Sequence, residues 1–172
     1  MRDTEFWDKH YLRIAKEISN LSYAIRRKVG CVIVKDRQMI SDGYNGTPQY
    51  FDNICEDIEC TLESTYCCPV TEKSIEISKN IEICKECKYC NLVTKPYVLH
   101  AEANAITKLS KSTMSADGAT LYVTDEPCFE CSKLIIQSNI KRVVYWREYR
   151  KHDGIELLKQ ANIEIIKYDE ID

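Results

Sequence analysis

The chain has 172 residues, of which 44% are hydrophobic and 30% are charged. This composition is typical of a globular protein and excludes a disordered, collagen-like or low-complexity chain. The net charge of -3 provides no basic surface, so we expect no obligate nucleic-acid partner. No apolar run reaches the ~20 residues that cross a bilayer, and the first residues lack a signal-peptide pattern, so we expect a cytoplasmic protein without a membrane partner.

A first helix is predicted over residues 4–22, where apolar residues recur at helical spacing with charges between them. A basic stretch, Arg26-Arg27-Lys28, follows this helix. Two short strands are predicted over residues 29–35 and 38–44. The polar pair Asp36-Arg37 between them suits a tight hairpin turn.

The periodic pattern is lost between residues 47 and 97, and this segment holds seven of the ten cysteines. Loops of this length are uncommon in compact domains unless they are functional or held by a metal. We therefore predict one domain over residues 1–172 with a cysteine-rich insertion at 47–97. Because the chain is longer than disulfide-rich secreted domains and lacks a secretion signal, metal ligands are favoured over disulfides.

Helices and strands alternate after the insertion, which indicates a mostly parallel sheet to which the first hairpin adds an antiparallel part. The predicted fold class is α/β, a three-layer αβα sandwich around a mixed sheet of about five strands. Its later elements are a helix at 100–109, a strand at 119–124, a helix at 128–138, a strand at 142–146, a helix at 153–161 and a strand at 163–168.

One histidine and two cysteines lie at the starts of two of these helices. His100 opens one helix, and Cys128 and Cys131 open the next, where their spacing of three places both thiols on one side of a turn. Three protein ligands are typical of a catalytic zinc site, which keeps a fourth position for water. Taken singly, the histidine could be structural and the cysteine pair could be a zinc knuckle or a redox pair.

Glu102 follows His100 by two residues, so it could reach a water on the metal without being a ligand. Zinc brings the pKa of its water to about 7, and a nearby carboxylate can take the proton and return it to a substrate. The order H-x-E…P-C-x-x-C is the known signature of zinc deaminases. The pattern therefore predicts a hydrolytic deaminase with Glu102 as its proton shuttle and His100, Cys128 and Cys131 as its zinc ligands.

The chain resembles the cytidine and deoxycytidylate deaminase superfamily, and within it the deoxycytidylate (dCMP) deaminases. The wider likeness covers about residues 4–46 and 97–168. The narrower likeness rests on four segments, which are Val29–Val34, Gly43-Tyr44-Asn45-Gly46, Tyr97–Ile106 and Ile135–Val143.

The resemblance implies a cytidine-deaminase-like fold and conversion of dCMP to dUMP and ammonia, which supplies dUMP for thymidylate synthesis. It also implies a homo-oligomer, commonly a hexamer. Asn45 matches the asparagine that meets the sugar, and Tyr149 matches an aromatic residue near the phosphate. The backbone N–H of Ala101, at a helix start, suits the carbonyl of the base.

Regulation by dCTP and dTTP is implied as well, with Mg²⁺ accompanying bound dCTP. A triphosphate needs local cations on an acidic protein. The candidate residues for this nucleotide are therefore the basic stretch and the family's glycine-rich element, namely Arg26, Lys28, Gly43, Tyr44, Asn45 and Gly46.

The insertion differs from that of other family members, which often carry cysteines or histidines that bind a structural zinc. We expect one structural zinc here, with Cys84 and Cys87 as the first candidate ligands and Cys55 and Cys60 as the next. Free thiols are the alternative.

Four other functions remain open at this point. The same zinc signature occurs in deaminases of other cytosine nucleosides or nucleotides and of tRNA adenosine, although the acidic charge argues against tRNA. A deaminase of riboflavin biosynthesis would carry a fused reductase domain. A zinc-binding interaction module would have no use for Glu102 beside a three-ligand site.

Overall fold

The computed structural model describes residues 3–60 and 90–171. One sheet has the strand order β2-β1-β5-β6-β7. Its strands are β1 (Gly30–Lys35), β2 (Gln38–Tyr44), β5 (Thr120–Asp125), β6 (Arg142–Arg147) and β7 (Glu164–Lys167), within two residues of the predicted bounds at each end. The mixed sheet of about five strands is therefore confirmed.

The expectation of a mostly parallel sheet is wrong for β1, the strand that lies between β2 and β5. β1 pairs antiparallel with β2 on one side and antiparallel with β5 on the other, whereas β5, β6 and β7 pair in parallel. β2 and β5 thus run in the same direction on opposite sides of β1. The chain segment between them joins two parallel strands that are not neighbours, which alternation along the sequence does not reveal.

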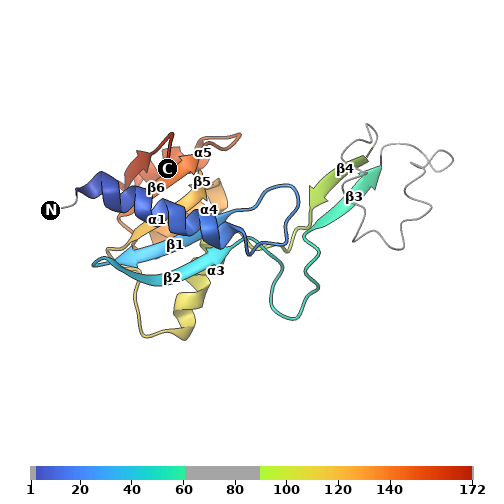
Figure 1. The fold of residues 1–172 in the computed structure, drawn as a ribbon, viewed down its shortest axis with the longest axis horizontal. Helices are drawn as coiled ribbons and strands as arrows, with labels where there is room; N and C mark the ends of the chain where they lie inside the picture. The colour runs from blue at the N-terminus through green and yellow to red at the C-terminus, as the bar shows by residue number, and fades with distance from the viewer. Residues whose placement is uncertain (1–2, 61–89, 172) are drawn as a thin grey trace.

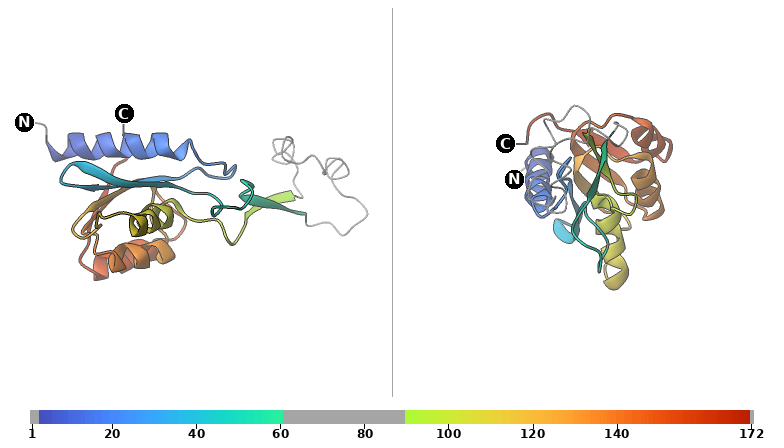
Figure 2. Two further views of the ribbon diagram at one scale, coloured as in Figure 1. Left: turned by 90° about the horizontal axis from the view of Figure 1, so that it is seen from below. Right: turned by 90° about the vertical axis from the view of Figure 1, so that its right-hand side faces the viewer.

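Helices cover both faces of this sheet, as the views in Figures 1 and 2 show. On β1, Cys31 and Ile33 pack into the core beneath α3, α4 and α5, while Val32 and Val34 pack into the core beneath α1. This alternation divides one strand between two cores and confirms the three-layer αβα sandwich. The helices are α1 (Thr4–Ser19), α3 (Ala101–Lys108), α4 (Phe129–Gln137) and α5 (Asp153–Gln160), with a 3₁₀ turn η2 (Leu109–Lys111) after α3.

The first helix begins where expected and ends earlier. The Asp3 side chain accepts a hydrogen bond from Phe6 N at 2.9 Å and caps the N-terminus. The helix ends at Ser19 rather than at residue 22. Ser22 instead donates a hydrogen bond to the Asn45 carbonyl oxygen at 2.7 Å, which draws the chain after the helix toward β2.

The predicted hairpin turn between β1 and β2 is confirmed. Asp36 and Arg37 have φ values of 51° and 63°. Two successive residues in the left-handed region are typical of the two-residue turns that fit the twist of β-hairpins.

The described ends of the insertion form a second, two-stranded sheet. β3 (Glu56–Cys60) pairs antiparallel with β4 (Cys90–Thr94), and the register sets Cys60 opposite Cys90. This hairpin extends away from the main sheet (Figure 1). Neither strand was predicted, because the segment has no core pattern of its own. Cys67, Cys68, Cys84 and Cys87 lie outside the described residues.

Among the described residues, no helix combines the length and the apolar character needed to cross a membrane.

Candidate active site

Two helix starts meet beside the sheet and carry the predicted catalytic residues. His100 is the N-cap residue of α3 and Cys128 is the N-cap residue of α4, both with extended backbone. Cys131 lies in the first turn of α4. The partial positive charge at the N-terminus of a helix favours the thiolate form of a nearby cysteine. At Cys131 the hydrogen bond to Cys128, burial and the Glu102 charge outweigh this effect and raise the pKa of the thiol.

Close backbone contacts set the positions of these helix starts. A Cβ on Gly43 of β2 would stand 2.3 Å from the Ala101 carbonyl oxygen, and a Cβ on Gly154 of α5 would stand 2.2 Å from the Pro127 carbonyl oxygen. Only glycine permits such approaches. β2 therefore packs directly on the start of α3, and α5 packs directly on the turn that leads to Cys128.

The three predicted metal ligands come together. His100 Nδ1 lies 3.4 Å from both Cys128 Sγ and Cys131 Sγ, and the three donor atoms all lie within 4.8 Å of one another. Zinc–nitrogen and zinc–sulfur bonds of about 2.0 and 2.3 Å separate tetrahedral ligands by roughly 3.5 Å. The separations and the nitrogen and sulfur donors therefore fit a zinc ion.

The electrostatics of the site suit metal binding and proton transfer. Hydrogen bonds from the Cys131 thiol and the His100 ring lower the pKa of Cys128 to about 4, so this thiol is ionised at neutral pH. Glu102 is only 4% exposed, and burial raises the pKa of its carboxyl to about 7. A carboxyl group with a pKa near neutrality can both take up and release a proton.

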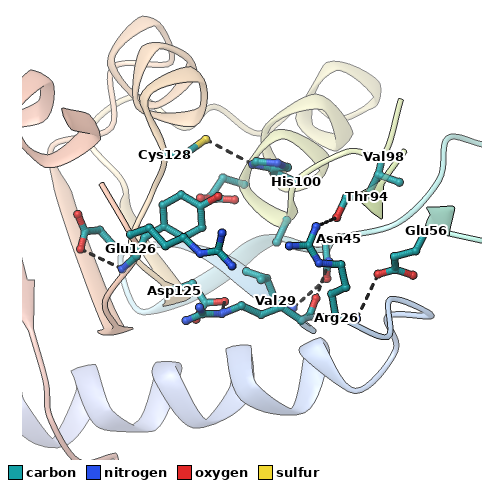
Figure 3. A pocket seen from close by; sticks show the side chains of 15 residues that line it. Arg26, Val29, Asn45, Glu56, Thr94, Val98, His100, Asp125, Glu126 and Cys128 are labelled. Atoms are coloured by element: carbon teal, nitrogen blue, oxygen red, sulfur yellow. Dashed lines mark hydrogen bonds and ion pairs between the residues drawn. The ribbon is translucent and has the colours of Figure 1, made fainter. Parts of the chain in front are cut away.

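A cavity of about 310 Å³ opens beside these residues. Figure 3 shows His100 and Cys128 on one side of it and Arg26 and Asp125 on the opposite side. Its wall includes the predicted residues His100, Ala101, Glu102, Cys128, Asn45, Tyr149 and Arg26, and also Arg27, Val29, Glu56, Thr94, Val98, Asp125, Glu126 and Arg150.

Asn45 lines the cavity and also braces its wall. Its Oδ1 accepts a hydrogen bond from Val29 N at 2.8 Å, and its Nδ2 donates one to the Arg27 carbonyl oxygen at 2.9 Å. The basic stretch is thereby held against the end of β2. A sugar contact by Asn45 would use the remaining hydrogen-bonding capacity of the same amide.

The other residues assigned to an effector nucleotide have structural contacts. Besides the Gly43 contact, the Tyr44 carbonyl oxygen accepts from Asn104 Nδ2 at 3.0 Å, and Gly46 and Leu99 exchange backbone hydrogen bonds at 2.8 and 3.1 Å. Lys28 is not part of the described cavity wall, and its carbonyl oxygen accepts from Arg147 Nη2 at 3.0 Å. A role for these residues in binding an effector remains a prediction.

Two arginines of the cavity wall, Arg26 and Arg27, contact acidic residues. The buried carboxylate of Asp125 accepts from Arg27 Nη2 at 2.9 Å and from Arg147 Nε at 2.6 Å. Arg26 donates from its backbone N to Glu56 Oε1 at 3.2 Å and from its side chain to Thr94 Oγ1 at 3.2 Å. Both strands of the insertion hairpin thus contact Arg26.

Sequence reasoning missed several residues of the wall, notably Glu56, Asp125, Glu126 and Arg150, and it named Arg27 only as part of the basic stretch. The pair Asp125-Glu126 directly precedes Pro127-Cys128, and Arg150 directly follows Tyr149, so closeness to named residues was an available signal. Glu56 had no signal, because β3 was not predicted.

Cys55, a candidate ligand of the structural zinc, lies in a small buried cluster with Ala24 and Val98. The residue is 1% exposed, and burial raises the pKa of its thiol. The other candidate with described backbone, Cys60, lies at the end of β3, opposite Cys90 of β4.

The sequence from residue 5 to residue 147 matches the family model described as the cytidine and deoxycytidylate deaminase zinc-binding region. The chain belongs to this deaminase family. His100, Glu102, Cys128 and Cys131 all lie within the matched region, so the candidate active site is formed by the part of the chain that defines the family.

Individual relatives named as deoxycytidylate deaminases support this family assignment. The deoxycytidylate deaminase of Saccharomyces cerevisiae is 31% identical over 163 residues, which cover 94% of this chain and 45% of the yeast protein. That of Mycobacterium phage D29 is 37% identical over 142 residues, which cover 83% of this chain and 95% of the phage protein. The chain therefore spans less than half of the yeast relative and nearly all of the phage relative.

A solved structure confirms the fold. The crystal structure of dCMP deaminase from cyanophage S-TIM5 in complex with dCMP and dUMP superposes with a TM-score of 0.72 at 34% sequence identity. The match covers 98% of this chain and 100% of the phage chain. The cytidine-deaminase-like architecture is thereby established for this chain.

Proposed function

We propose that this protein catalyses the hydrolytic deamination of dCMP to dUMP and ammonia. The observation that carries the proposal is that the metal donors and the arginines lie on opposite sides of one cavity. His100 and Cys128 lie on one side of it and Arg26 on the opposite side (Figure 3). Buried Glu102 interacts with all three metal donors, His100, Cys128 and Cys131. A pyrimidine nucleotide has a base to deaminate at one end and an anionic phosphate at the other. The relatives named as deoxycytidylate deaminases support the same substrate.

His100, Cys128 and Cys131 would hold the zinc ion of the family. Zinc supplies a hydroxide nucleophile at neutral pH, because it lowers the pKa of a coordinated water to about 7. Glu102 takes up the proton of the attacking water, passes it to the ring nitrogen of the base and assists the departure of ammonia. A pKa near 7 suits both directions of this transfer.

Backbone and side chains would orient the nucleotide for attack. The N–H of Ala101, the first residue of α3, donates to the base carbonyl, and Asn45 meets the sugar. Arg26 and Arg150, with Tyr149 beside them, meet the phosphate. Binding energy from the phosphate then holds the base at the metal and Glu102.

The direct test compares kcat/KM for dCMP, deoxycytidine, cytidine and tRNA adenosine. We expect dCMP to exceed deoxycytidine by about 10²-fold or more, because a charged phosphate contact is worth about 1.5–3 kcal/mol per hydrogen bond. Arg150→Ala should raise KM for dCMP and leave KM for deoxycytidine nearly unchanged. Faster deamination of tRNA or of cytidine would overturn the assignment to dCMP.

We also propose that dCTP with Mg²⁺ activates a homo-oligomer, by family resemblance a hexamer, and that dTTP inhibits it. Two nucleotides of opposite effect require two states that bind them differently. The candidate residues are Arg26, Lys28 and the Gly43–Gly46 element. Initial rates against dCMP concentration, measured with each nucleotide and with neither, test this regulation. Hyperbolic curves that neither nucleotide shifts would reject it and leave the deaminase assignment intact.

A supply of dUMP for thymidylate synthesis is the metabolic role that such an activity would serve. The proposed second, structural zinc belongs to the cysteine-rich insertion and is separate from the three-donor site.

A further inference from the structure

Glu126 is a buried carboxylate with no part in the chemistry described above. It follows Asp125 at the end of β5, precedes Pro127-Cys128 and is 3% exposed. A carboxylate buried to this degree is costly unless hydrogen bonds or a cation compensate it. Its partners therefore indicate what it stabilises.

The hydrogen-bond partners of Glu126 lie in one segment, the last residue of β6 and the connection from β6 to α5. His152 Nδ1 donates to Glu126 Oε1 at 2.9 Å and lies 3.0 Å from Oε2. Tyr149 N donates to Oε2 at 3.3 Å, and Glu126 N donates to the Arg147 carbonyl oxygen at 2.8 Å. Figure 3 shows the Glu126 side chain at the edge of the cavity. Four polar contacts thus join one residue to positions 147–152.

This connection carries two residues of the cavity wall, Tyr149 and Arg150. It is otherwise a surface segment: Arg150 and Lys151 are exposed, and the His152 side chain is 61% exposed. Exposed segments with few buried contacts open locally at low free-energy cost. Neighbouring Asp125 anchors the start of the segment through Arg147, which leaves Glu126 to anchor its middle and end.

We propose that Glu126 and His152 form a clamp that positions Tyr149 and Arg150 over the cavity and thereby sets the affinity for the nucleotide phosphate. Both are positioning residues, since they act through Tyr149 and Arg150 rather than on the reacting atoms. The same strand end that delivers the metal ligand Cys128 thus also holds the phosphate side of the cavity. The affinity argument rests on the proposed function, because it takes dCMP as the nucleotide.

The kinetic test uses His152→Ala, His152→Asn, Glu126→Gln and the double variant of Glu126→Gln with His152→Ala. Lys151→Ala is the matched control, because Lys151 is an exposed neighbour in the same segment. We expect His152→Ala to raise KM for dCMP about tenfold with kcat changed less than about twofold, the effect of one lost hydrogen bond to a charged group. KM for deoxycytidine, which lacks the phosphate, should stay within about twofold.

Two comparisons separate the clamp from a general loss of structure. The amide of Asn occupies the place of the imidazole Nδ1, so His152→Asn should restore KM for dCMP toward that of the wild type. KM for dCMP in the double variant should be no higher than in the more impaired of the two single variants, because both changes remove the same interaction between Glu126 and His152. Zinc content should stay at the wild-type value in every variant.

Amide hydrogen exchange tests the clamp without substrate. His152→Ala should speed exchange at the Tyr149 amide about tenfold, while Lys151→Ala should not. Three results would each overturn the clamp. The first is an unchanged exchange rate at the Tyr149 amide in His152→Ala. The second is an equal effect of His152→Ala and Lys151→Ala on KM for dCMP, and the third is failure of His152→Asn to restore that KM. A wild-type protein that does not deaminate dCMP would overturn the proposed function instead, and the exchange experiment would still decide the clamp.

Discussion

Gly43 lies so close to Ala101 that a Cβ at position 43 would stand 2.3 Å from the Ala101 carbonyl oxygen and 2.5 Å from Ala105 N. Strand β2 therefore presses directly on the first turn of α3. His100 and Glu102 flank Ala101, so the packing of two backbones sets the place of a proposed metal ligand and of the proposed proton shuttle. Gly43 belongs to a sequence element that resembles a ligand-binding element of the family. In the structure it makes a packing contact with the helix that carries the candidate active site.

Gly43→Ala should both destabilise the protein and impair turnover, because the neighbours that the new methyl group meets are backbone atoms that cannot move aside. Overpacking of this kind costs about 1–3 kcal/mol in the free energy of unfolding. Gly46→Ala is the control, since its Cβ would meet only the Tyr44 side chain at 3.7 and 3.8 Å. The measurements are the free energy of unfolding in urea and kcat of the two variants. Equal stability of Gly43→Ala and Gly46→Ala would contradict the packing argument.

Glu102→Gln should keep the metal and lose turnover. Glutamine has nearly the same shape as glutamate but cannot carry the proton, and general acid–base catalysis contributes about 10²–10⁴-fold. The measurements are kcat for dCMP and zinc content of the purified variant. Near-normal turnover would exclude Glu102 as the shuttle, and loss of zinc would show that its role is to support the metal site.

Removing Arg142 should destabilise the fold far from the active site. Its guanidinium makes two hydrogen bonds of 2.7 Å to the carboxylate of Asp8, which is 1% exposed and also accepts from the hydroxyls of Tyr122 and Tyr168. Arg142→Met leaves this carboxylate buried without a cation, which costs about 3–5 kcal/mol. The double variant with Asp8→Asn should recover part of the loss in urea unfolding. A double variant less stable than Arg142→Met would argue against the buried charge as the cause.

Metal analysis should find about two zinc ions per chain, one at the three-donor site and one in the insertion. His100→Ala should remove the first, because it deletes one of three ligands. The double change Cys84→Ser and Cys87→Ser should remove the second and leave the first in place. An unchanged zinc content in the double variant would mean that Cys84 and Cys87 are not ligands.

Most of the secondary structure and the chemical core of the site follow from local sequence. The strand alternation at Cys31 to Val34, the left-handed turn at Asp36-Arg37 and the Cys128–Cys131 spacing each depend on a few consecutive residues. Such patterns are readable because strand and helix periodicities are set by backbone geometry within one or two turns. The combination of His100, Glu102 and the cysteine pair was recognisable because it matches the known signature of zinc deaminases, although His100 and Cys128 are 28 residues apart.

The rest depended on contacts between residues far apart in the chain. Local periodicity does not determine which strand lies beside β1, and its antiparallel neighbour β5 begins only at Thr120. Arg27 and Asp125 are 98 residues apart, and Glu126 and His152 are 26 apart, so no motif announces either pair. A buried carboxylate pairs with a cation or an N–H group that lies nearby in the folded structure, wherever that group is in the sequence. For that reason the sequence by itself predicted the candidate metal donors and the candidate proton shuttle, and only the tertiary structure decided which residues shape the cavity around them.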